Sequence, residues 1–292
     1  MKKIMQLVLA VIISISLCNA AFAENMIQIK GSDTLINLVQ RLAEVYMDDY
    51  SNDFIAVTGG GSGTGIAALI NKKTDITNAS RGMKAKEVDN AVASGVSPKR
   101  VVIAMDGLSV IVNGRSPITK LTIQEIGNIF SGAITNWKEV GGPDMPITLY
   151  GRQSNSGTFV FFRDQVVKAD YASTMNRMNG NAQIVEAVKQ DVSGIGYVGV
   201  GYVKDAVGLN VLKVAARAGG TYASPLSSAD VKSGNYPIAR PLNQYLNGKP
   251  EGAVKEFIAF ELSDEGQRIV EEEGFFPLPQ EYIDYNMQSV GL

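Results

Sequence analysis

Short strand-like segments alternate with amphipathic helical segments along most of this chain. Met26–Lys30 has the pattern of a strand, and apolar residues then recur at helical spacing from Leu35 to Tyr46. Phe54–Thr58 begins the same order again, and a glycine-rich turn and a short helix through Ile66 and Leu69 follow it. Strand, polar turn and helix in this repeated order are typical of an α/β protein with largely parallel sheets.

The middle of the chain continues in this order, with Gly107 between two strongly apolar strands. Thr119 is the expected N-cap of the helix that follows them. The strands are expected at Val101–Ala104, Leu108–Val112 and Ile147–Tyr150, and the helices at Leu121–Phe130 and Phe159–Lys168.

The last third of the chain is expected to end in helices. Gly194–Val203 alternates glycine with apolar residues, which favours a buried strand and a turn where backbones approach closely. Tyr236–Leu246 contains two prolines, so we expect it at a sheet edge or in a crossover rather than in a sheet centre. Ala253–Glu261 predicts a helix, and Ser263 is the expected cap of another helix, which Gly274 ends.

The N-terminus has the pattern of an export signal. Lys2 and Lys3 precede the apolar run Ile4–Leu17, and Ala21–Ala23 supplies the small-x-small pattern of a cleavage site. The apolar run is shorter than the roughly 20 residues that a comfortable membrane span needs, which disfavours a retained anchor. We therefore expect Met1–Ala23 to be a cleaved signal peptide.

Composition narrows the classes of function. Loss of Lys2 and Lys3 with the signal takes the net charge from −2 to −4, which argues against nucleic acid or an anionic membrane as the main partner. The chain has no histidine, which excludes Ser-His-Asp catalysis and the commonest transition-metal ligand. Its one cysteine, Cys18, lies inside the expected signal, so no disulfide is expected in the exported protein.

Three turns that follow strands share one chemistry. Each places hydroxyl side chains and glycine at a helix start, where unpaired N–H groups and the helix dipole favour an anion. Each turn alone is also compatible with a plain helix cap, or with a flexible loop for the glycine run. Parallel strands end at the same edge of a sheet, so the three turns could converge on one small oxyanion. The turns are Gly31–Thr34, Gly59–Gly65 and Ser154–Thr158, with Arg152 ahead of the third.

Other motifs fail on spacing. The glycine run matches G-x-G-x-x-G in no register, and no G-x-x-x-x-G-K-[ST] occurs, so dinucleotide and P-loop sites are unsupported. Neither Ser62 nor Ser156 lies in G-x-S-x-G, and no histidine is present to act as a base. A nucleophilic enzyme is therefore disfavoured.

Seven segments, in order, resemble the exported phosphate-binding proteins of bacterial ABC uptake systems. The resemblance covers nearly the whole chain after the signal, and the ordered set is more specific than any single member. The segments are IKGSDT, AVTGGGSGTGI, DITNASRGMK, MDGLSVIVN, IFSGAITNWKEVGG, RQSNSGT and SGIGYV.

The resemblance implies a two-lobed α/β fold of the type II periplasmic-binding class. Each lobe would be a central mixed sheet flanked by helices, hinged by crossover strands, with phosphate bound between the lobes. The implied first lobe spans residues 24–108 and 238–292, and the implied second lobe spans residues 109–237.

The resemblance also implies the phosphate-binding residues. They come from the three turns and from the ASRGMK segment, and no metal or cofactor is expected. They are Ser32, Thr34, Leu35 through its N–H, Ser62, Ser80, Arg81, Arg152, Ser156, Gly157 and Thr158.

One departure from the family concerns the proton acceptor. Arg81 follows Ser80 where many relatives have an aspartate that accepts the proton of phosphate, a proton that sulfate lacks. An arginine cannot accept a proton. We therefore expect Asp33, or secondarily Asp106, to supply the acceptor, whereas Asp33 as a plain N-cap is the alternative. Ser154 is a second departure, because some relatives carry there an aspartate that orients the site arginine.

These features predict a non-enzymatic receptor for inorganic phosphate. It would act outside the cytoplasm as a monomer in the periplasm, without nucleic acid, and deliver phosphate to an ABC permease at the membrane surface. Closure would bring donors from both lobes around one anion. The alternatives are a receptor for sulfate, molybdate or another tetrahedral oxyanion, and a secreted phosphatase-like enzyme.

Overall fold

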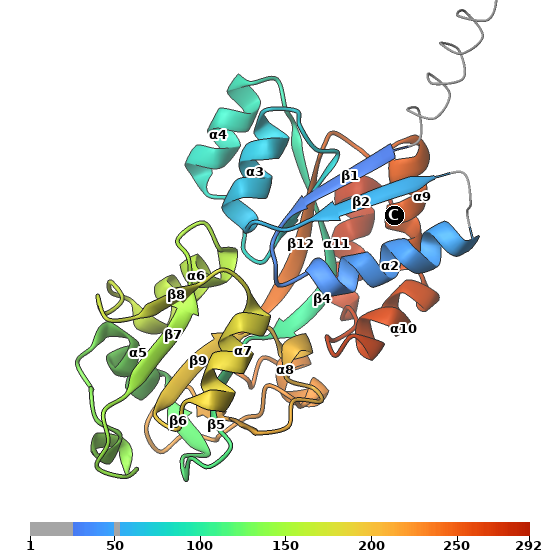
Figure 1. The fold of residues 1–292 in the computed structure, drawn as a ribbon. Coiled ribbons are helices and arrows are strands. Elements are labelled where there is room, and N and C mark those ends of the chain that lie inside the picture. The colour runs from blue at the N-terminus through green and yellow to red at the C-terminus, as the bar shows by residue number, and fades with distance from the viewer. Residues whose placement is uncertain (1–25, 50–52) are drawn as a thin grey trace, which may run out of the picture.

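The structure is a computed structural model that describes residues 26–49 and 53–292, so the expected signal peptide lies outside the described residues. Two mixed five-stranded sheets each form the centre of a lobe (Figure 1). In the first lobe the order is β2 (Phe54–Thr58), β1 (Met26–Gly31), β3 (Ile76–Ala79), β12 (Ala239–Asn247) and β4 (Pro98–Gly107). Strands β1, β2 and β3 are parallel, and β12 is antiparallel to β3 and β4.

The second lobe is built on the other sheet. Strand β7 is parallel to β8 and β9, whereas β5 is antiparallel to β9 and β10. A separate parallel pair joins β6 (Lys120–Thr122) and β11 (Lys213–Ala215). The sheet order is β10 (Leu209–Val211), β5 (Ser109–Asn113), β9 (Gly194–Val198), β7 (Thr148–Arg152) and β8 (Asn176–Met178).

Helices cover both sheets, and Figure 1 shows α6 at the junction of the lobes. The first-lobe helices are α2 (Ile36–Asp49), α3 (Ser62–Ile70), α4 (Ala85–Ala93), α9 (Gly252–Leu262), α10 (Asp264–Glu272) and α11 (Gln280–Val290). The other helices are α5 (Ile123–Ser131), α6 (Gly157–Phe162), α7 (Asn181–Gln190), α8 (Ser228–Lys232), the 3-10 helices η1 (Trp137–Val140) and η3 (Val200–Tyr202), and the π-helix η2 (Arg163–Val167).

An aromatic cluster stabilises the part of the second lobe that holds β7. Phe162 stacks on Tyr197 with ring centroids 4.1 Å apart, and Phe130 contacts Phe162 edge-on at 5.0 Å. The Tyr197 hydroxyl accepts a hydrogen bond from the Arg152 N–H at 3.2 Å. The cluster therefore fixes the end of β7, from which the Arg152 side chain extends.

The strands and turns expected from the sequence are largely confirmed, but two helix predictions need correction. Thr119 does not cap α5, because Leu121 pairs in strand β6 and Thr122 is the N-cap, with its hydroxyl accepting from the Glu125 N–H. The helix expected over Phe159–Lys168 is α6 followed by the π-helical turn η2. Lys168 ends it in the left-handed region, at φ 54°.

The prediction that Tyr236–Leu246 avoids the centre of a sheet is wrong. Strand β12 lies between β3 and β4. Pro241 is tolerated because β3 pairs only with Asn243–Tyr245, so the strand has a single neighbour at the proline, and a bulge between Leu242 and Asn243 follows. A proline lacks the N–H that a second neighbour would need.

Within the described part of the chain, no helix is both long enough and apolar enough to cross a membrane. The lobe boundaries expected from the sequence stay a prediction.

Candidate anion site between the two lobes

Three loops meet at the junction of the lobes. The loops after β1 and β2 lie at one sheet edge because these strands are parallel, and the Gly61 N–H donates to the Gly31 carbonyl at 2.9 Å. The loop after β7 approaches from the second lobe, where the Asn155 carbonyl accepts from the Gly63 N–H at 2.9 Å. The Asn155 side-chain amide donates to the Gly60 carbonyl, also at 2.9 Å. The three turns singled out in the sequence therefore converge.

Five hydroxyl groups form a buried cluster where these loops meet. Ser32 Oγ donates to Ser80 Oγ at 2.9 Å, and Thr34 Oγ1 lies 2.9 Å from Thr158 Oγ1. Ser80 Oγ lies 3.3 Å from both Ser62 Oγ and Thr158 Oγ1. Because Thr158 belongs to the second lobe and the other four to the first, the cluster spans the junction.

Backbone amides orient one hydroxyl of this cluster and the hydroxyl of Ser156 at the start of α6. Ser62 Oγ accepts from the Ser80 N–H at 3.1 Å, and Ser156 Oγ accepts from the Phe159 N–H at 3.3 Å. An amide N–H can only donate, so each serine keeps its own proton for an acceptor. These two side chains are therefore suited to donate to an oxyanion.

Gly157 lies at a close approach of the two lobes. A Cβ at this position would collide with Ser62 Oγ and would lie 2.7 Å from Ser80 Oγ. Glycine is therefore required for this approach of the two lobes, and its bare backbone leaves the start of α6 accessible to a small anion.

Arg152 is a buried charged residue at the end of β7, ahead of the third loop. Its Nη2 donates to the Asp33 carboxylate and to the Asn179 carbonyl, the latter at 2.9 Å. Its Nε and Nη1 are buried and have no hydrogen-bond partner among the described residues. Buried N–H groups are almost always paired, so a cationic side chain with two free nitrogens is suited to an anionic ligand.

Leu35 lies in the core, and its N–H donates to the Ser32 carbonyl at 3.2 Å within the turn after β1. This turn precedes α2, so its amides lie at the helix start as the sequence predicts.

Arg81 pairs with an acid of its own lobe through its terminal nitrogens, whereas its Nε is buried without a partner among the described residues. Its two terminal nitrogens bond both carboxylate oxygens of Glu87 at 2.7 Å, and Nη1 also donates to the Gly82 carbonyl. Burial alone would raise the pKa of Glu87, but the hydrogen bonds from Arg81 and from the Lys84 N–H hold it below its ordinary value. Glu87 therefore competes with any anion for this arginine.

Arg240 is a residue of the site region that sequence reasoning missed. It lies on β12, and its Nη1 donates to the Ser80 carbonyl at 2.9 Å while Nη2 donates to Thr158 Oγ1 at 3.0 Å. Nε and Nη2 also bond Asp106 Oδ2 at 2.9 and 2.8 Å, and Asp106 Oδ1 accepts from the Val200 N–H. The only signal in the sequence was a charged residue inside an apolar, strand-like run.

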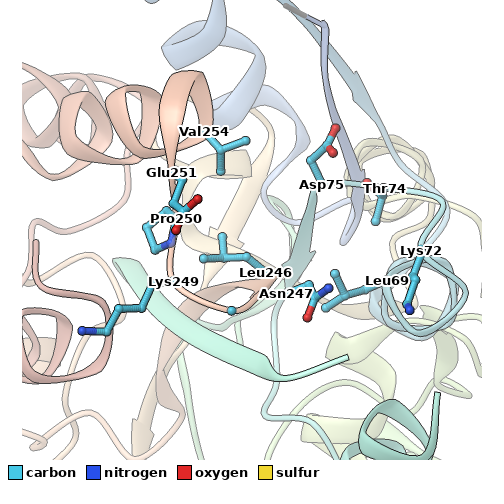
Figure 2. Close-up of a pocket in the computed structure, with 11 residues that line it drawn as sticks. Leu69, Lys72, Thr74, Asp75, Leu246, Asn247, Lys249, Pro250, Glu251 and Val254 are labelled. Carbon is cyan, nitrogen blue, oxygen red and sulfur yellow. The ribbon is translucent and has the colours of Figure 1, made fainter. Parts of the chain in front are cut away.

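A second polar feature, the cleft in Figure 2, lies away from this site. It has a volume of about 520 Å³ and lies beside the end of α3 and the loop after β12. Lys72 and Lys249 lie on opposite sides of it, and Asp75 and Glu251 also line it. The described residues contain no group of three His, Cys, Asp or Glu side chains that could hold a metal ion.

The sequence matches a known family model over most of its length. Residues 19–265 match the model described as the PBP superfamily domain. A phosphate-binding protein PstS of Pseudomonas aeruginosa is 31% identical over 280 residues, which cover 90% of this chain and 86% of that protein. A phosphate-binding protein PstS of Borreliella burgdorferi is also 31% identical, over 94% of this chain and 98% of its own length.

Solved structures agree with these relatives. A structure from Clostridium perfringens, described as a phosphate ABC transporter substrate-binding protein with bound phosphate, has a TM-score of 0.79 and 29% identity. The match covers 87% of this chain and all of that one. An ABC-type phosphate transport receptor from Vibrio cholerae has a TM-score of 0.70 and 28% identity, with the same coverage.

Proposed function

We propose that this chain, which belongs to the PBP superfamily and within it to the PstS-like phosphate-binding proteins, binds inorganic phosphate between its two lobes and delivers it to an ABC transporter permease. The relatives named above are binding proteins and receptors, and the same non-enzymatic role is proposed here. The proposal includes export through a cleaved signal peptide and action at the outer face of the membrane as a monomer.

One observation carries the proposal. Hydroxyl groups from both lobes meet at the junction, and Arg152, which pairs there with Asp33, has a buried Nε and Nη1 without a partner among the described residues. The arginine nitrogens can only donate and the hydroxyls can also donate, whereas a phosphate oxygen can accept several hydrogen bonds at once. The proposed phosphate ligands are Arg152, the Leu35 N–H, Ser32, Thr34, Ser62, Ser80, Ser156, Gly157 and Thr158.

Selectivity for phosphate over sulfate needs an acceptor for the phosphate proton. Asp33 is the proposed acceptor, because its carboxylate lies in the turn after β1 and reaches Arg152. Asp106 is less suited, because it is fully buried and its Oδ2 already takes two hydrogen bonds from Arg240, whereas Asp33 is 18% exposed and each of its oxygens takes one. Arg81 is proposed to act only indirectly, because Glu87 holds its terminal nitrogens.

Calorimetric titration with inorganic phosphate tests the function directly. We expect tight binding by the unmodified protein and a loss of at least about a hundredfold in affinity for Arg152→Ala, because a buried charge-assisted donor pair is removed. Arg268→Ala is the matched control, since Arg268 is an exposed arginine on α10. Sulfate and molybdate are titrated in parallel.

The outcomes separate the candidate functions. Phosphate binding that is lost in Arg152→Ala and kept in Arg268→Ala supports the proposal. No heat with phosphate but binding of sulfate or molybdate would assign the site to another oxyanion. Release of phosphate from a phosphoester by the unmodified protein would contradict a purely binding role.

A further inference from the structure

The ion pair between Arg152 and Asp33 crosses the junction of the two lobes. Arg152 ends β7 in the second sheet, whereas Asp33 follows β1 in the first sheet. The arginine side chain is 2% exposed and the aspartate 18%. Within its own lobe, the Arg152 guanidinium bonds only the Asn179 carbonyl among the described residues. Among the residues that the structure describes, the carboxylate that pairs with Arg152 therefore comes from the opposite lobe.

Asp33 is itself held from both lobes. Its Oδ1 accepts from the Gly60 N–H at 2.8 Å, which ties the carboxylate to the glycine loop of its own lobe. Its carbonyl accepts from the Tyr202 hydroxyl at 2.6 Å, and Tyr202 lies in η3, directly after β9 of the second sheet. Burial raises the pKa of Tyr202 to about 12, so the hydroxyl keeps its proton and donates.

The pairing leaves the anion-binding capacity of Arg152 intact. Asp33 and Asn179 use only Nη2, and the donors on Nε and Nη1 stay available. A guanidinium is planar and rigid, so fixing one nitrogen fixes the directions of the others. The contact with Asp33 thus determines where the remaining N–H groups point.

We propose that Asp33 is a cross-lobe positioning residue, which latches onto Arg152 when the lobes close, holds the closed form together and orients the arginine toward phosphate. This inference rests on the proposed function. Unlike acceptance of the phosphate proton, stabilisation of the closed form would slow the release of any bound anion. A ligand shifts a conformational equilibrium only through its differential affinity for the two forms. The latch supplies part of the closed form's stability before any anion is bound.

Interlobe distance and dissociation kinetics test the latch. Exposed Asp89 on α4 and Ala182 on α7 are replaced by cysteine and labelled for single-molecule energy transfer, in a Cys18→Ser background that leaves no other cysteine. Stopped-flow measurements give the dissociation rates of phosphate and sulfate. Asp75→Asn is the matched control, because Asp75 also accepts a backbone N–H, from Gln28 at 2.8 Å, without pairing with an arginine.

For Asp33→Asn we expect a smaller closed fraction without ligand and dissociation of phosphate faster by about tenfold or more, since one charge of a partly buried pair is lost. Sulfate dissociation should accelerate as well. The melting temperature should stay close to that of Asp75→Asn. Tyr202→Phe should reduce the closed fraction less, because it removes a neutral hydrogen bond and keeps the ion pair.

Two results would overturn the latch. One is an Asp33→Asn protein with an unchanged closed fraction and unchanged dissociation rates. The other is weakened phosphate binding with normal closure and normal sulfate dissociation, which would limit Asp33 to accepting the phosphate proton. If the unmodified protein does not bind phosphate, the proposed function is contradicted and the latch is not. The latch is still tested in that case, because the closed fraction is measured without ligand.

Discussion

At the scale of single residues, Glu261 is a buried acid without a cation partner among the described residues. It is 0% exposed, and its Oε1 accepts from Gln244 Nε2 at 3.0 Å. Its Oε2 and the Oε1 of Gln244 are both buried without a partner. Burial raises the pKa of Glu261 to about 8, and the hydrogen bond from Gln244 opposes this shift. A proton on Oε2 would let the acid donate to the unpaired amide oxygen.

This acid makes stability depend on pH in a defined direction. The neutral form is favoured in the folded protein, so its contribution is complete below the ordinary pKa of 4.5 and is lost as the pH rises through about 8. We expect the free energy of unfolding to fall by several kcal/mol across this range, at about 1.4 kcal/mol per pKa unit. Urea denaturation at pH 5 and pH 8 measures the difference.

Glu261→Gln is the companion variant. Glutamine keeps the shape, cannot ionise and supplies an N–H for the Gln244 oxygen, so the variant should lose most of this pH dependence. An equally steep fall in the variant would show that other groups cause it.

At the scale of elements, the short helix α6 begins at a serine with two possible roles. Ser156 is its N-cap, because Ser156 Oγ accepts from the Phe159 N–H at 3.3 Å. The same hydroxyl keeps a proton that can be donated to phosphate. Ser227 caps α8 in the same way, accepting from the Asp230 N–H at 3.2 Å, but it is not among the proposed phosphate ligands.

Comparison of the two caps separates these roles. Ser156→Ala and Ser227→Ala should each lower the free energy of unfolding by about 1 kcal/mol, the usual cost of a lost cap. Only Ser156→Ala should also weaken phosphate binding, by roughly tenfold to a hundredfold, because it removes a hydrogen bond to a charged ligand. Thermal unfolding and calorimetry measure both effects. Equal phosphate affinities in the two variants would limit Ser156 to a capping role.

Local sequence patterns predicted the strands and turns that hold the site. They could not predict the pairing of Arg240 and Arg81 with acidic side chains, because those pairs form only in the folded chain. The turns after β1, β2 and β7 were visible because strand, glycine and hydroxyl residues are neighbours in the sequence. Arg240 was not, because its partner Asp106 is 134 residues away and the prolines around it suggested an edge strand. The pairing of Arg81 with Glu87 likewise depends on how the chain turns into α4, which composition does not reveal.

At the scale of the whole molecule, Arg240 connects residues of both lobes. It is 2% exposed and pairs with Asp106, which is 0% exposed. Burial lowers the pKa of the Arg240 guanidinium, and the Asp106 carboxylate opposes that shift. Through the Ser80 carbonyl and Thr158 Oγ1, the arginine also holds one site residue from each lobe. We therefore expect the free energy of unfolding to depend on the Arg240–Asp106 ion pair, and phosphate affinity to depend on the hydrogen bonds from Arg240 to Ser80 and Thr158.

Arg240→Ala should lower the free energy of unfolding by about 3–5 kcal/mol, because it leaves the Asp106 charge buried without its cation. Adding Asp106→Asn removes that charge, and an asparagine oxygen still accepts from the Val200 N–H, so the double variant should recover most of the stability. It should not recover phosphate affinity, because Thr158 and Ser80 still lack their shared donor. Urea denaturation and calorimetry on the single and double variants test both statements. A double variant that regains stability and also binds phosphate as the unmodified protein does would show that the pair only stabilises the fold.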